Sequence, residues 1–271
     1  MSTPGLRGSL TWHLFGRDLA EFAIASPIDE RITTDWAWSG STGAGVRVCV
    51  IDSGIADDHP FVGPVQAWYT VMGDTVEETE PGDAFGHGTA CASIIRRVAP
   101  DCELTSVRIL GGTGGGMGSA LLAAVRWSVR QRFHVVNLSL STTRLQFDRE
   151  LRQLADEAHF QGTALVASAH NSPVESYPWR YSSVISVGSH AEDDSDLVIA
   201  NTHPPVDFFA HGRAVIAAGL GGSTTRNTGN SFATPHVTGR CALILAKHPD
   251  LTVPQVKTVL YLTSNNVRGA T

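Results

Sequence analysis

Short runs of apolar, often β-branched residues alternate along this chain with segments long enough to form helices. The runs cover residues 46–51, 104–110, 134–140 and 163–169, and the helical patterns between them cover residues 119–132 and 147–160. Near-continuous hydrophobicity is typical of strands that are covered on both faces, and strands joined by helical crossovers pair in parallel. The sequence therefore predicts an α/β fold of three layers, with a mainly parallel central sheet flanked by helices.

Length and charge narrow the class of protein further. The chain has 271 residues, of which 42% are hydrophobic and 17% charged, and it contains no low-complexity tract or repeat. One compact domain over residues 36–271, preceded by an N-terminal segment of residues 1–35, fits these values. The formal net charge is -6, and lysine and arginine are scattered along the chain. This pattern excludes a nucleic acid as partner, because such proteins concentrate basic residues on one face.

The N-terminus and the cysteines bear on location. The first thirty residues lack the basic, apolar and small-residue regions of a secretory signal, and no run of 18 apolar residues occurs. Cys49, Cys91, Cys102 and Cys241 have neither the density of a disulfide framework nor the paired spacing of a zinc site. We therefore expect free thiols, a cytoplasmic protein without a membrane partner, and no metal or cofactor.

Three segments rich in small residues carry an aspartate, a histidine and a serine. Asp52 lies in residues 50–54, His87 in residues 86–89 and Ser231 in residues 229–236. Each residue alone would more often be structural than catalytic. Together they supply what nucleophilic acyl transfer needs: a hydroxyl, an imidazole that takes its proton, and a carboxylate that orients the imidazole. The carboxyl ends of parallel strands meet at one sheet edge, where the sequence places Asp52.

These segments, in this order, resemble the three signature motifs of the subtilases, from about residue 40 to about residue 265. The resemblance implies a subtilisin-like catalytic domain with Asp52, His87 and Ser231 as the triad. It also implies that Asn171, after the run at 163–169, donates its side-chain amide to the oxyanion hole. Cys91, one helical turn after His87, is similar to the thiol of the proteinase K-like branch, and we expect it to be a packing residue.

The resemblance also predicts a peptide-binding groove and a small first specificity pocket. The groove residues are Gly114, Gly115, Gly116, Ser139, Leu140, Ser141, Ser168, His170 and Ser176. The glycines and the segment 139–141 correspond to two strands between which an extended peptide docks. His170, Ser141 and Ser176 stand where the family usually has glycine, so the pocket should be narrow and large aromatic residues poor before the cut. Glu175 lies close by in the sequence, which adds the expectation that a basic residue can bind there.

Two family features are not recognisable in the sequence. Only residues 96–101 lie between the His87 helix and the next strand, which leaves no room for the calcium loop of many secreted subtilases, and the acidic residues 74–80 are expected to form a solvated loop. The stretch before Asp52 is shorter than the family's inhibitory pro-domain, which predicts unaided folding or a processed chain. The resemblance places Pro235 in about the first turn of the nucleophile helix, where a proline costs little.

The sequence thus predicts a serine endopeptidase of restricted specificity that acts on a peptide or protein in the cytosol, for example in leader processing. Two alternatives stay open. An acyl-enzyme can be intercepted by an amine, as in a peptide ligase or macrocyclase, although the helical insertion of known cyclising relatives is not visible. A non-catalytic peptide-binding module is the other, and the intact triad argues against it.

Overall fold

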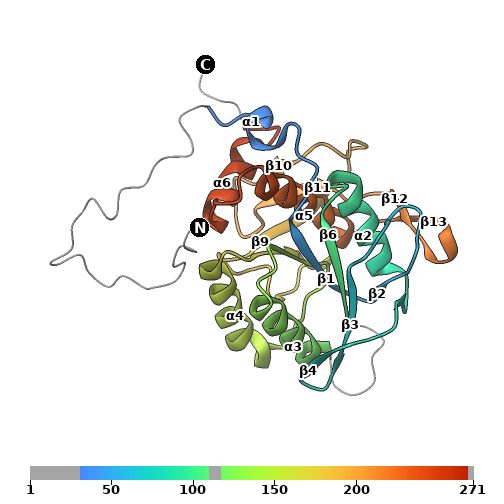
Figure 1. Cartoon of the computed structure of the whole chain (residues 1–271). Coiled ribbons are helices and arrows are strands. Elements are labelled where there is room, and N and C mark those ends of the chain that lie inside the picture. The colour runs from blue at the N-terminus through green and yellow to red at the C-terminus, as the bar shows by residue number, and fades with distance from the viewer. Residues whose placement is uncertain (1–30, 110–116, 268–271) are drawn as a thin grey trace, which may run out of the picture.

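A nine-stranded sheet runs through the centre of the molecule, with helices on both faces (Figure 1). The computed structural model describes residues 31–109 and 117–267. Most of the predicted N-terminal segment and the predicted groove glycines Gly114, Gly115 and Gly116 lie outside the described residues. The strand order is β10-β11-β9-β8-β7-β1-β6-β3-β4. The strands are β1 (Arg47–Asp52), β3 (Ala67–Met72), β4 (Thr75–Glu78), β6 (Glu103–Arg108), β7 (Val135–Leu138), β8 (Ala164–Ser168), β9 (Ile185–His190), β10 (Ile199–Ala200) and β11 (Phe208–His211).

The sheet is parallel except at its two edges, so the predicted fold class is confirmed. β1 pairs in parallel with β6 on one side and β7 on the other, and β4 and β10 pair antiparallel at the edges. The four predicted apolar runs form β1, β6, β7 and β8. The acidic stretch was expected to be a loop, but most of it forms β4, because an exposed edge strand tolerates charged side chains.

Alternate residues of the strands pack into two separate hydrophobic cores, one on each face of the sheet. In β1, Val48 and Val50 face a core that they share with α2 (His87–Val98), α5 (Asn230–Lys247) and α6 (Val253–Leu262). Cys49 and Ile51 face the other core, under α3 (Met117–Arg130) and α4 (Asp148–Gln161). Successive side chains of a strand point to opposite faces, so an unbroken apolar run packs against both helix layers. The small elements are α1 (Thr34–Trp38), η2 (Leu145–Phe147), η3 (Leu220–Gly222), β2 (Gly54–Ile55), β5 (Gly82–Asp83), β12 (Val215–Ala218) and β13 (Thr224–Asn227).

Neither a membrane span nor a disulfide occurs in the part of the chain that the structure describes. Within residues 31–109 and 117–267, no helix is long and apolar enough to cross a membrane. Cys49, Cys91, Cys102 and Cys241 are all buried and free. Burial raises the pKa of the Cys102 thiol to about 11, so this thiol stays protonated at neutral pH.

The turn between α2 and β6 is organised by one guanidinium group. Arg96, near the end of α2, donates hydrogen bonds to the backbone carbonyls of Val62, Pro64, Pro100 and Cys102. A cluster of carbonyl oxygens is the kind of environment that otherwise binds a hard cation. Here the positive side chain supplies that charge, so the short connection is held without a metal ligand.

We predict that Arg96→Met lowers the free energy of unfolding by about 3 kcal/mol, because four carbonyls lose a charged donor. For a chain of this size this corresponds to a fall of about 6–12 °C in Tm, measured by calorimetry. The matched control is Arg97→Met, since the exposed Arg97 donates to a single carbonyl, that of Ile216. EDTA should change the Tm of the wild type by less than about 2 °C. Equal effects of the two substitutions, or a large fall with EDTA that calcium reverses, would contradict this account.

Candidate active site

Asp52 and His87 meet at the carboxyl end of β1. Asp52 is the last residue of β1 and is fully buried, whereas His87 begins α2 and is partly exposed. His87 Nδ1 lies 2.8 Å from Asp52 Oδ1, which also accepts a hydrogen bond from the backbone N–H of Ser53. Gly88 permits this approach, because a Cβ there would lie 2.0 Å from the carbonyl oxygen of Gly54 and 3.1 Å from Asp52 Cβ. The small residue after the histidine is therefore a steric requirement.

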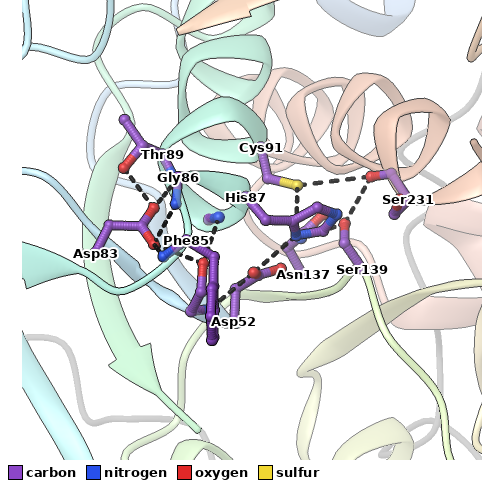
Figure 2. Close-up of polar contacts among 12 residues, drawn as sticks. Asp52, Asp83, Phe85, Gly86, His87, Thr89, Cys91, Asn137, Ser139 and Ser231 are labelled. Carbon is purple, nitrogen blue, oxygen red and sulfur yellow. Dashed lines mark hydrogen bonds and ion pairs between the residues drawn. The ribbon is translucent and has the colours of Figure 1, made fainter. Parts of the chain in front are cut away.

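A second carboxylate, Asp83, holds the start of α2 in place (Figure 2). It accepts hydrogen bonds from the hydroxyls of Ser53 and Thr89 and from the backbone N–H groups of Phe85, Gly86 and Thr89. Burial alone would raise the pKa of Asp83, but these donors outweigh it and lower the pKa. The sequence analysis missed this residue.

The carboxylate of Asp52 also sets the protonation of His87. Burial by itself would lower the pKa of His87, but the neighbouring Cys91 and Asp52 together outweigh burial and the pKa is raised. Cys91 lies close by, with its sulfur 4.0 Å from His87 Nδ1. Burial raises the pKa of Cys91, so it stays a neutral thiol and Asp52 is the charge that acts on the imidazole.

Ser231 is the second residue of α5, and Pro235 lies about one turn further along, later than expected. A proline has no N–H, so the carbonyl of Ser231 has no helical donor at the usual position. That carbonyl instead accepts a hydrogen bond from the hydroxyl of Ser139 at 2.8 Å and from the thiol of Cys91 at 3.6 Å (Figure 2). The proline thus frees a carbonyl that is bound by Ser139, which directly follows β7, and by Cys91 of α2. Asn137, in β7, in turn donates a hydrogen bond to Ser139 Oγ and so orients that hydroxyl.

The hydroxyl of Ser231 makes no hydrogen bond to His87 within the described residues, a looseness common in enzymes without substrate. The side chain of Asn171 is already oriented. Its Oδ1 accepts the backbone N–H of Asn230 at 2.8 Å, and a Cβ on Gly229 would lie 3.3 Å from its amide nitrogen. Because the oxygen is engaged, the amide N–H groups remain available beside the nucleophile, at the N-terminus of α5.

One cluster here contains potential metal ligands. Ligand atoms of Asp52, His87 and Cys91 lie within 4.8 Å of one another. A cation bound by all three would compete with the Asp52–His87 hydrogen bond, so the arrangement suits inhibition by a soft metal better than metal catalysis.

The predicted groove residues fall into two groups. Ser141 and His170 line one cavity of about 770 Å³. The hydroxyls of Ser139, Ser168 and Ser176 lie on buried residues, and Leu140 packs against the core beneath α3 and α4. Ser176 is fully buried and accepts a hydrogen bond from the indole of Trp179 at 2.8 Å, so it does not reach the cavity surface. Of the three expected glycine replacements, only Ser141 and His170 are placed to contact a ligand.

Comparisons with known proteins agree with this geometry. The profile described as the subtilase family matches residues 43–271. Subtilisin DY of Bacillus licheniformis is 31% identical over 243 residues, which cover 84% of this chain and 86% of that protein. Subtilisin of Bacillus pumilus is 32% identical and covers 85% and 89%. For subtilisin E of Bacillus subtilis (strain 168), the match spans only 62% of the relative's length. The crystal structure of a cold adapted subtilisin-like serine proteinase superposes with a TM-score of 0.67 at 28% identity, over 85% of this chain and 88% of that one. The chain therefore belongs to the subtilase family and is a subtilisin-like serine endopeptidase.

Proposed function

We propose that this enzyme hydrolyses peptide bonds through an acyl-enzyme on Ser231, with His87 as general base and acid. The observation that carries the proposal is the convergence of the Asp52–His87 hydrogen bond and the N-terminus of α5 at one sheet edge. Such an arrangement leaves Nε2 of His87 free to take the proton of the Ser231 hydroxyl, while Asp52 holds Nδ1 and stabilises the imidazolium.

Each step then has a residue to perform it. As Ser231 Oγ bonds to the substrate carbonyl, the negative charge that develops on the carbonyl oxygen is met by the amide of Asn171 and the backbone N–H of Ser231. His87 passes the proton to the leaving amine. Water, deprotonated in turn by His87, attacks the ester, and Ser231 regains its proton.

We predict that Asn171→Ala lowers kcat by about 10²–10³-fold with little change in KM, because the amide acts on charge that exists only in the transition state. Steady-state kinetics on a fluorogenic peptide would measure this. Asn201→Ala is a control for loss of an asparagine away from the site, since the side chain of Asn201 donates to the carbonyls of His203 and Val206. A rise in KM with kcat unchanged would show that Asn171 binds substrate uniformly instead.

Restricted specificity and a cytoplasmic location are part of the proposal. The side chains of Ser141 and His170, which line the cavity at positions where the family usually has glycine, support the first. The four free, buried cysteines among the described residues are compatible with a reducing compartment. Cell fractionation tests the location.

Covalent labelling separates hydrolysis from the two alternatives. A fluorophosphonate should label Ser231 of the wild type and not the Ser231→Ala variant, and peptide cleavage should accompany labelling. Labelling with transfer to an added amine but no hydrolysis would favour a ligase. No labelling of the folded protein would favour a binding module.

A further inference from the structure

The cavity that both Ser141 and His170 line carries no acidic residue among its described lining residues. It measures about 770 Å³ and is lined by Met117, Gly118, Ser119, Ser141, Thr142, Thr143, Arg144, Gln146, Phe147 and His170. Hydroxyls, an amide, an imidazole and one guanidinium are donors that suit a negatively charged or neutral polar group.

Chain connectivity places this cavity beside the reacting bond. His170 directly precedes Asn171, whose side chain touches the residues before Ser231. Ser141, on the opposite lip, lies two residues after Ser139, which holds the carbonyl of Ser231. Ser141 and His170, the two lips of the cavity, thus lie within two residues of Ser139 and Asn171, which contact Ser231 and Asn230. A substrate whose carbonyl oxygen faces Asn171 would direct the side chain of that same residue between the lips.

The charge of the cavity comes from Arg144. Its side chain is exposed and forms no ion pair within the described residues. The acid that could oppose it, Glu175, lines the neighbouring cavity on the other side of His170 and pairs with Arg180 at 2.6 Å. Because Glu175 is paired with Arg180 there, no acidic group among the described lining residues favours a basic substrate side chain.

We propose that this cavity selects peptides with glutamate or aspartate immediately before the cleaved bond, and that Arg144 binds that carboxylate. The inference rests on the proposed function of Ser231 and Asn171 and adds the substrate class. A guanidinium binds a carboxylate through two parallel, charge-assisted hydrogen bonds, which a neutral amide cannot reproduce. The hydroxyls of the lining can satisfy the remaining lone pairs.

The test is a set of fluorogenic peptides that differ only at this position, with Glu, Asp, Gln, Ala, Phe or Lys. We expect kcat/KM for Glu to exceed that for Gln by about 10-fold or more, and the difference to shrink at high salt because Arg144 is exposed. Arg144→Gln should abolish the preference for Glu over Gln, so that kcat/KM for the two peptides becomes equal within about twofold. Arg149→Gln is the matched control: it removes the same charge from an exposed position on nearby α4 that is outside the cavity lining.

A binding measurement keeps this inference separate from the catalytic one. Fluorescence anisotropy on the Ser231→Ala protein, with labelled peptides that end in Glu or Gln, measures the affinity of the cavity for each peptide without turnover. Tighter binding of the Glu peptide that is lost in Ser231→Ala/Arg144→Gln supports the inference even if the wild type does not hydrolyse peptides. Three results would overturn the inference. They are equal wild-type kcat/KM for the Glu and Gln peptides, equal affinity of the Ser231→Ala protein for the two peptides, and a Glu preference that persists in Arg144→Gln.

Discussion

Ser231→Ala is expected to lower peptide hydrolysis by about 10⁴–10⁶-fold while the fold stays intact. The substitution removes the nucleophilic oxygen but not the carbonyl of residue 231, through which Ser139 and Cys91 hold the start of α5. His87→Ala should cause a loss of similar size, because serine and histidine act as one unit and their effects do not add. Active-site titration of the wild type, followed by progress curves at high enzyme concentration, gives the ratio.

The control for Ser231→Ala is structural. Its Tm and circular dichroism should match those of the wild type within about 2 °C, since a serine-to-alanine change at a partly exposed helix start usually alters stability little. Retention of more than a few per cent of wild-type turnover by this variant would remove Ser231 from the mechanism. Full loss with an unfolded protein would leave the peptide-binding experiment on Ser231→Ala impossible, and His87→Ala would then be used for it.

Asp52→Asn is expected to lower kcat by about 10⁴-fold near pH 8. Asparagine can donate to His87 Nδ1 and so favour the wrong tautomer, and it cannot stabilise the imidazolium that forms during the reaction. The pH profile should move as well. Activity needs neutral His87, whose pKa the Asp52 carboxylate raises, so wild-type kcat/KM falls as the pH drops through a value above the ordinary histidine range.

Without that carboxylate, the pKa of His87 loses the attraction that opposes burial, so the acid limb of Asp52→Asn should lie at lower pH than that of the wild type. The measurement is kcat/KM from about pH 5 to pH 10 for both proteins. Asp57→Asn removes a nearby exposed carboxylate and should leave both rate and profile unchanged. An acid limb that stays in place in Asp52→Asn would show that another group sets it.

Several features could be predicted from the sequence because they depend on local patterns. The four apolar runs became interior strands, since a strand covered by helices on both faces is composed mainly of apolar residues. The same runs place Asp52 at a strand end, and small residues beside Asp52, His87 and Ser231 indicated close approach. Thr252 and Gln255 form a capping box at the start of α6, which is another local signal because the two residues are three positions apart in the chain.

Tertiary contacts decided what those patterns left open. Asp83 has no local signature of importance, because its role depends on donors from Ser53 and Thr89 that only folding brings together. Ser176 was expected at the cavity surface, but its depth depends on how Trp179 packs. Pro235 lies deeper in α5 than expected, and its cost is offset by Ser139 and Cys91, which are far from it in sequence.

The sequence by itself determined the family, the sheet and the candidate reactive groups, because residue type and near-neighbour periodicity carry that information. The tertiary structure alone decided which cavity Arg144 lines, that Glu175 is paired with Arg180, and that Arg96 organises the turn after α2. These outcomes depend on the distances between side chains remote in the chain, and electrostatic attraction and hydrogen bonding fall off too steeply with distance for a linear sequence to reveal them.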